Sequence, residues 1–401
     1  MNNQQYRAGV TEAAKLFAGN RLKLARQLAG LRKVELAAQI EKTPAAITAY
    51  ESGRTRPAPS TVAQLSVALG VEPGFFLATP STMLSLSSNV IPHFRSLRTT
   101  TQLVRDQATA YGWMVHDIVQ TFERYIDMPK CRIPSFPVPI DGEITSEPTA
   151  AAQELRKAWE VEKGPIPHLL RSAENNGIVV AFGPTQSASV DAYSFETPHR
   201  PIVILNPIKD DYYRQRFDLA HELGHLIMHT DAEPGGRIVE LQAHQFASEL
   251  LMPANEIISQ LPHRLNWSQF LTLKEYWGVS MQALLYRARE LGTLSDVTYR
   301  NAMIRMSKEG WRRQEPGRHP GLEQPSLLPK SLELLEGAGI SAVDIAREAR
   351  APMSIFSTAT ARQSRTLGSV ADRGDIESDS HEEPKREGEV VSLFGHHSIK
   401  G

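Results

Sequence analysis

The chain has 401 residues, which is too many for one ordinary hydrophobic core and predicts two or three domains. Its composition, 41% hydrophobic and 22% charged with a net charge of −1, is that of a globular protein and excludes a polycation. A single cysteine, Cys131, excludes both a disulfide framework and a cysteine-rich zinc site.

Charge is distributed unevenly along the chain. Residues 1–80 contain ten Lys and Arg against five Asp and Glu, a surplus of five that suggests a polyanionic partner for this part alone. The first residues lack the apolar run of a signal peptide. No uninterrupted apolar stretch approaches the roughly 18 residues that span a bilayer. We therefore expect a cytoplasmic protein that makes no membrane contact.

Residues 18–78 are predicted to be all-helical, with short helices between turn signals. The four expected helices cover residues 20–28, 35–40, 44–52 and 60–69. Thr43 followed by Pro44 favours a helix start, because threonine caps free N–H groups and proline suits the first helical position. Ser60 is the expected cap of the fourth helix, and Gly70 ends it.

The middle of the chain changes from a helical to a strand pattern. A linker rich in Ser and Thr is expected over 79–99, then a long amphipathic helix over 100–127. After a Pro-rich loop, 129–148, come an Ala-rich helix near 150–159 and another that ends at Asn176-Gly177. Three short β-rich runs follow, at 178–182, 190–195 and 201–205.

The remaining elements are again helical. We expect helices over 211–229 and 237–252, a helical pair over 267–292 and two short helices within 328–350. From about residue 358 the chain is polar and aperiodic, which is typical of a disordered tail. The predicted divisions are 1–78, a linker and connecting helix over 79–148, a domain over 149–258, a helical region over 259–357 and a tail over 358–401.

The sequence His221-Glu222-Leu223-Gly224-His225 carries the strongest chemical signal. On a helix the two histidines lie one turn apart on one face and can hold a single Zn²⁺. Glu222 is then placed to act as general base toward a water molecule that the metal activates. The apolar flanks predict a buried helix, where these polar groups are costly unless something satisfies them. A relic site or a purely structural histidine pair is the alternative.

A zinc site of this kind needs a third protein ligand. The chain has Asp231 where a third histidine six residues past His225 would stand. Glu240 and His244 share a face of the next helix, one turn apart, so either is a candidate and the other would support it. His229, one turn past His225, is a further candidate. Charge favours Glu240, because one carboxylate leaves the site near +1.

Arg216–His225 and Glu240–Pro253 together resemble the ImmA/IrrE family of metallo-endopeptidases, over roughly residues 160–255. The resemblance implies a zincin-like domain in which His221, His225 and Glu240 bind Zn²⁺ and Glu222 is the general base. Family members that are understood cleave a helix-turn-helix repressor, so it also implies a protein substrate. His244 stands where the family often has Asn or Asp, and it can donate a hydrogen bond to the Glu240 carboxylate.

Residues 20–77 resemble a Cro/cI-type (XRE) helix-turn-helix domain, most clearly at Tyr50–Arg54 and Ala68–Val71. The resemblance implies that the helix over 44–52 enters the major groove of double-stranded DNA. Candidate contacts from this helix and its flanks are Lys33, Thr43, Pro44, Ala45, Thr48, Arg54 and Arg56. The recognition face offers no Arg, Asn or Gln for paired base contacts, so readout would depend on thymine methyls, on Lys33 or on DNA shape.

The sequence therefore predicts an α+β protein: an all-α helix-turn-helix domain, a small zincin-like metallopeptidase domain, a helical C-terminal region and a loose tail. The preferred function is a cytoplasmic DNA-binding regulator that cleaves a protein with zinc. We expect it to form a homodimer, and a helix-turn-helix repressor is the candidate substrate. One alternative is a regulator whose peptidase-like domain senses metal or ligand without proteolysis. The other is a peptidase whose N-terminal domain only binds protein or dimerises.

Overall fold

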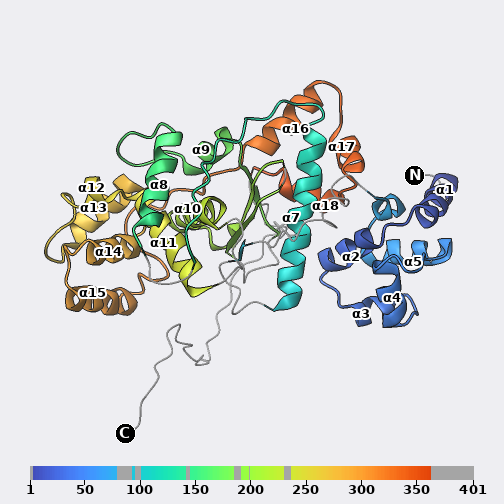
Figure 1. The fold of residues 1–401 in the computed structure, drawn as a ribbon, viewed down its shortest axis with the longest axis horizontal. Coiled ribbons are helices and arrows are strands. Elements are labelled where there is room, and N and C mark those ends of the chain that lie inside the picture. Colours follow the sequence, from blue (N-terminus) through green and yellow to red (C-terminus); the bar gives the residue numbers. More distant parts are fainter. Residues whose placement is uncertain are drawn as a thin grey trace, which may run out of the picture. The chain divides into compact units, whose positions relative to one another are not determined.

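The computed structural model describes residues 3–78, 93–94, 101–140, 145–184, 191–197, 199–229 and 236–362, all within one compact unit, Met1–Arg365. The fold is mostly helical with a small sheet, in agreement with the α+β prediction (Figure 1). Within these ranges, none of the helices combines the length and apolar character that crossing a membrane requires. The tail predicted from residue 358 lies outside the described residues beyond residue 362.

Five helices and a short 3-10 helix form the N-terminal part of the chain. They are α1 (Asn3–Lys15), α2 (Gly19–Leu28), α3 (Lys33–Gln39), α4 (Pro44–Glu51), α5 (Pro59–Leu69) and η1 (Pro73–Phe76). The sequence did not predict α1. The fourth predicted helix begins at Pro59 after Ala58 rather than at a Ser60 cap, because the fixed φ of proline suits the first position. Gly70 ends it with a φ of 63°, a conformation that glycine adopts without strain.

Helix α7 (Gln102–Phe122) follows a Thr101 cap and ends five residues before the predicted boundary at 127. The N–H groups of Tyr125 and Ile126 both bond back to the Phe122 carbonyl, so the chain turns there instead of continuing the helix. An ion pair joins α7 to α2, since Arg21 Nη1 lies 2.7 Å from Asp117 Oδ2 and both side chains are buried. The same guanidinium donates to the Phe75 and Arg350 carbonyls.

The sheet contains β2 (Val179–Phe182), β3 (Ala192–Phe195) and β4 (Ile202–Leu205), with the two-residue strand β1 (His93–Phe94) at its edge. The strand order is β1-β3-β4-β2. Strand β2 runs parallel to β4, whereas β3 is antiparallel to both β1 and β4. All three predicted β-rich runs therefore contain strands of one sheet.

Both faces of the sheet are covered, which explains why its strands read as continuous apolar runs. Val180 and Val203 face a core formed with α10 and α11, whereas Val179 and Ile202 face a core formed with α7 and the N-terminal helices. In Figure 1 the strands accordingly lie between α10 and α7. Alternate residues of each strand thus serve two different cores.

The other helices lie around these cores. They are α8 (Glu147–Ala158), α9 (Leu169–Asn175), α10 (Tyr212–Met228), α11 (Arg237–Leu251), α12 (Ala254–Ile257), α13 (Trp267–Trp277), α14 (Met281–Glu290), α15 (Asp296–Lys308), α16 (Leu327–Gly337), α17 (Ala342–Glu348) and α18 (Met353–Ala359), with the 3-10 helix η2 (Pro207–Lys209) before α10. Helices α12, α15 and α18 were not predicted from the sequence. Helix α18 ends at Ala359, close to the residue from which the sequence predicts the tail.

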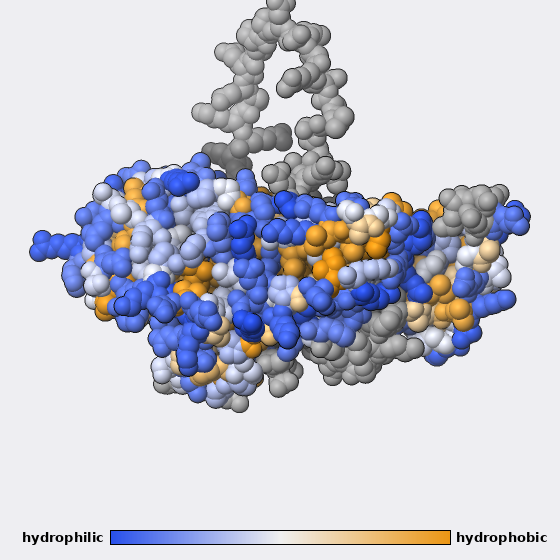
Figure 2. All heavy atoms as spheres, turned by 90° about the horizontal axis from the view of Figure 1, so that it is seen from above, coloured by the Kyte–Doolittle hydropathy of each residue, from blue (hydrophilic) through white to orange (hydrophobic). Residues whose placement is uncertain are grey.

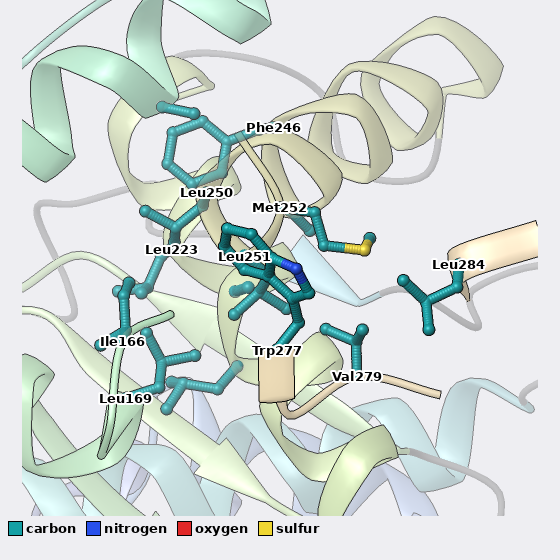
Figure 3. Close-up of a cluster of buried hydrophobic side chains, with 14 of the residues drawn as sticks. Ile166, Leu169, Leu223, Phe246, Leu250, Leu251, Met252, Trp277, Val279 and Leu284 are labelled. Carbon is teal, nitrogen blue, oxygen red and sulfur yellow. The ribbon is translucent and has the colours of Figure 1, made fainter. Parts of the chain in front are cut away.

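Figure 3 shows part of the hydrophobic core to which Leu223, a residue of the predicted metal motif, belongs. Leu223 of α10 lies there with Phe246 and Leu250 of α11, and Trp277 of α13 closes the cluster. All four side chains are buried. Apolar packing therefore fixes the two helices that carry the motif.

On the outside of the molecule, hydrophilic residues cover most of the face in Figure 2, and apolar surface is confined there to patches between them.

Two buried arginines tie the loops around α10 and α11 to these helices. Arg216 of α10 donates to the Gly278 and Ile166 carbonyls at 3.0 and 2.7 Å and pairs with Glu323 at 2.5 Å. Arg287 of α14 pairs with Glu249 of α11, and its guanidinium also donates to the Met252 carbonyl. Each pair is almost completely buried, so removing one partner leaves a charge in an apolar surrounding.

We predict that Glu249→Gln lowers the free energy of unfolding by about 3–5 kcal/mol, because it removes the buried carboxylate partner of Arg287 and leaves only the partly exposed Glu290 beside that charge. Glu290→Gln is the matched control, since Glu290 pairs with the same arginine at 2.8 Å but its side chain is 31% exposed. That variant should cost about 1 kcal/mol or less. Denaturant unfolding of both variants checks this, and equal losses would contradict it.

His116 of α7 is a buried titratable group outside the metal motif. Its side chain is fully buried, and neither ring nitrogen has a hydrogen-bond partner within the described ranges. Burial, with a smaller contribution from the nearby His199, lowers the pKa of His116 from 6.5 to about 4. The folded protein therefore keeps this ring neutral at pH values where the unfolded chain binds a proton.

We predict that the stability contributed by neutral His116 is present above pH 6.5 and is lost as the pH falls toward 4. Over this range the unfolding free energy of the wild type should fall by about 3 kcal/mol more than that of His116→Phe. Denaturant unfolding at several pH values measures the two slopes. Parallel slopes would show that His116 takes up its proton in the folded state.

Candidate metal centre

Asp211 caps the start of helix α10, since its carboxylate accepts hydrogen bonds from the Tyr213 and Arg214 N–H groups. Such a cap fixes the start of the helix, and the predicted motif then lies in its buried second half. Gly224 lies within the motif and faces α11. A Cβ built at Gly224 would come 3.0 Å from Phe246 Cδ1, so glycine allows α11 to pack closely there.

Three side chains from the two helices bring their ligand atoms together. The Nε2 atoms of His221 and His225 are 3.1 Å apart. Glu240, in the first turn of α11, places Oε2 3.3 Å from His221 Nε2 and Oε1 3.7 Å from His225 Nε2. Both imidazoles are buried, whereas the Glu240 side chain is 24% exposed, so solvent reaches the group from the Glu240 side.

These distances fit a tetrahedral metal site. Ligand atoms at the 2.0–2.1 Å typical of zinc are about 3.3 Å apart when they occupy corners of a tetrahedron. The three observed separations, 3.1, 3.3 and 3.7 Å, lie around that value. Within the described residues, His221, His225 and Glu240 are the group of side chains whose ligand atoms could hold a metal ion. Their donor atoms, two nitrogens and one oxygen, suit a divalent transition metal.

Glu222 is fully buried next to His221 in the sequence, and a residue of the sheet holds its carboxylate. Its Oε2 accepts a hydrogen bond of 2.7 Å from Ser194 Oγ, a side chain of β3. Since Ser194 alternates with Tyr193 and Phe195, its side chain points to the α10 face of the sheet while theirs join the opposite core. The sheet thus positions the carboxylate that the sequence predicts to be the base.

His229 ends α10 and lies behind His225 rather than among the three ligand atoms. Its Nδ1 is 3.1 Å from His225 Nδ1, and its Nε2 is 2.9 Å from Gln242 Oε1. Burial lowers the pKa of His229, and the contact with Gln242 partly opposes that shift. Both ring nitrogens of His229 therefore contact protein groups. Because these contacts occupy the atoms that would bind a metal, they do not support the alternative that His229 is the third ligand.

His244 lies one turn beyond Glu240 between two aromatic rings. Its ring centroid is 4.9 Å from that of Phe217 and 5.0 Å from that of Tyr286. The three side chains whose ligand atoms lie together include that of Glu240 but not that of His244. The predicted support of Glu240 by His244 stays a prediction.

The predicted DNA-contacting residues gather on and around α4. Thr43 caps this helix by accepting a hydrogen bond of 3.2 Å from the Ala46 N–H. Thr43, Pro44 and Ala45 are exposed, and Thr48 is half-buried. The start of the helix is thus open to a partner, as major-groove recognition requires.

The basic residues predicted to contact DNA differ in how many hydrogen bonds and ion pairs they make with the rest of the protein. Lys33 Nζ donates to Thr48 Oγ1 at 3.3 Å and lies 3.4 Å from Glu51, so it is fixed beside α4. Arg54 and Arg56 are exposed on the following turn, and Arg56 also donates to the Lys15 carbonyl at 2.7 Å. Both exposed arginines can reach a phosphate from the end of α4.

Comparison with known families supports this description. Residues 173–289 match the sequence model described as the IrrE N-terminal-like domain. The chain has an IrrE N-terminal-like domain. A helix-turn-helix family model matches residues 22–76, so a helix-turn-helix domain precedes it. No curated protein matches the chain. The matched IrrE N-terminal-like region extends from α9 into α14, and it includes both helices of the candidate centre.

Sequence reasoning missed the groups that surround the candidate ligands. Ser194 gave no signal, since a serine in a β-rich run is ordinary and its contact with Glu222 depends on the packing of β3 on α10. Gln242 follows Glu240 by two residues and was not singled out. The sequence offered His229 as a candidate ligand, and its spacing of one turn from His225 also predicts the contact between the two rings.

Proposed function

We propose that this protein is a DNA-binding regulator that hydrolyses a peptide bond in a protein substrate with the help of zinc. Residues 1–78 would bind DNA, and residues 149–258 would contain the peptidase site. The observation that carries the proposal is the convergence of His221, His225 and Glu240, whose ligand atoms all lie within 4.8 Å of one another.

Zinc is the metal that the donor set favours. Two imidazoles and one carboxylate are the ligands of a common class of catalytic zinc sites, in which the fourth position stays open. Glu240 would lower the net charge of the occupied site to about +1, which suits a surrounding of largely apolar helices. Its partial exposure leaves a route by which a substrate reaches the site.

Bound zinc would polarise the scissile carbonyl and lower the pKa of a water molecule. The residues of this chain supply the proton transfers. Glu222 would take a proton from the attacking water at its carboxylate and deliver it to the leaving amine. The hydrogen bond from Ser194 holds one carboxylate oxygen, Oε2, so that the carboxylate keeps a fixed orientation during both transfers.

The helix-turn-helix domain supports DNA as the second partner. Arg54 and Arg56 would neutralise phosphates, while the exposed start of α4 lies against the base edges. Lys33 is held beside Thr48 and would contribute either a phosphate or a base contact. Because the face carries Pro44 and Ala45 instead of paired hydrogen-bond donors, we expect modest base selectivity.

The resemblance to the ImmA/IrrE family favours a protein substrate, and a helix-turn-helix repressor is our first candidate. The two alternative functions are outcomes of the experiments below. Metal binding without proteolysis would indicate a sensor. Proteolysis without DNA binding would indicate that the N-terminal domain contacts protein or dimerises.

We predict that the purified wild type binds about one Zn²⁺ per chain. His221→Ala, His225→Ala and Glu240→Ala should each abolish tight binding, since each removes one ligand. His244→Ala should only weaken binding or slow turnover, by about 10–100-fold. Glu222→Gln should keep the zinc and lose proteolysis, because the amide cannot accept the proton. Metal analysis and comparison of cellular proteins in wild-type and Glu222→Gln cells measure these outcomes.

His263→Ala is the matched control for the metal experiment, because His263 is an exposed histidine of the same matched region. It should leave zinc binding unchanged. A wild type that cannot be loaded with zinc would refute the metal site. Zinc binding that survives Glu240→Ala but not His244→Ala would exchange the roles of these two residues.

We predict that the full-length protein binds duplex DNA with an affinity that falls steeply as salt rises. Arg54→Ala and Arg56→Ala should each weaken binding on all sequences alike and reduce the salt slope by about one. Arg313→Ala, at an exposed arginine outside the helix-turn-helix domain, is the control and should change neither quantity. Binding measured by anisotropy over a salt series checks this. Absence of binding at low salt would favour the protein-contact function.

A further inference from the structure

A chain of hydrogen bonds extends from His225 away from the candidate ligand group. His225 Nδ1 lies 3.1 Å from His229 Nδ1, and His229 Nε2 lies 2.9 Å from Gln242 Oε1. Gln242 Nε2 in turn donates to the Pro139 carbonyl at 2.7 Å. His225, His229 and Gln242 are each 1% exposed. The chain therefore joins the end of α10, helix α11 and the loop before α8, with its first two contacts buried and the last one, to Pro139, partly buried.

The direction of every proton in this chain follows from its last member. The Pro139 carbonyl can only accept, so the Gln242 amide directs its NH₂ group there and turns its oxygen toward His229. That oxygen also only accepts, so His229 carries its proton on Nε2. His229 Nδ1 is then the acceptor, and the proton between the two rings belongs to His225 Nδ1.

This direction places the His225 lone pair on Nε2, the atom that lies 3.1 Å from His221 Nε2 and 3.7 Å from Glu240. A histidine binds a metal through the ring nitrogen that carries no proton, and the hydrogen bond at its other nitrogen sets the tautomer and the ring plane. The chain from Pro139 thus selects the form of His225 that can act as a ligand.

We propose that His229 is a positioning residue of the metal centre, which with Gln242 holds His225 in the tautomer and orientation that bind the metal. The proposal rests on the zinc site proposed above. His229 acts through His225, since its Nδ1 contacts His225 and its Nε2 contacts Gln242. The spacing of one helical turn between the two rings brings this contact about on α10 itself.

The test uses two independent breaks of the chain and one rescue in the full-length protein. His229→Phe fills the space without an acceptor for His225, and Gln242→Leu removes the acceptor for His229. His229→Asn is the rescue, since its side-chain oxygen can accept from His225 Nδ1. His263→Phe, at an exposed histidine, is the matched control.

Zinc affinity, measured by competition with a chelator, should fall about 10–100-fold in His229→Phe and in Gln242→Leu. It should recover in His229→Asn and stay unchanged in His263→Phe. Thermal unfolding of the metal-free variants identifies any that do not fold, and Gln242→Leu carries the test if His229→Phe does not. Wild-type affinity in both folded variants would overturn the proposal while the zinc site stands.

A second readout needs no metal. Long-range ¹H–¹⁵N spectra of the metal-free protein, labelled at histidine, should show His225 protonated on Nδ1 and His229 on Nε2. Breaking the chain should move His225 to the other tautomer or to a mixture, which a merely structural role for His229 would not do. Opposite tautomers in the wild type would overturn the proposal. Correct tautomers in a protein that binds no zinc would support the chain and refute only the metal site.

Discussion

Helices α10 and α11 approach each other at Gly224, where the absent side chain leaves room for the ring of Phe246. All parts of the candidate centre depend on this contact. Two of the proposed ligands stand on α10, and the third, Glu240, stands on α11 together with Gln242. A wider separation of the two helices would take the carboxylate away from both imidazoles and break the link between His229 and Gln242 at the same time.

The geometry around this contact is maintained by apolar packing and by charges that cannot be exposed cheaply. Leu223 and Leu250 fill the space below the motif, and Arg216 anchors α10 to the loop at Gly278. Glu249 fixes the other end of α11 through Arg287. A centre built in this way on helices holds its ligands in place before any metal binds, which is the condition for tight and selective binding.

Local patterns in the sequence predicted the parts of this structure that local physics determines. The His221 and His225 pair follows from the helical period alone, and Glu240 followed from charge and from the family pattern. Ser194 and Pro139 could not be predicted, because their contacts with Glu222 and Gln242 depend on how distant segments pack. Helix α15 was missed although Ser295 caps it, since its exposed Val297 and Ile304 obscure the amphipathic pattern.

The ion pair between Arg21 and Asp117 has a consequence for the integrity of the molecule after cleavage. It joins the helix-turn-helix domain to α7 beneath a shared apolar core, and Gln107 adds a hydrogen bond to the Leu28 carbonyl. Pulling the two parts apart would break this ion pair and expose the shared apolar core to water. A cut in the backbone between α5 and α7 would therefore yield two fragments that stay associated, as a nicked but intact particle, with the DNA-binding fragment retained by the remainder.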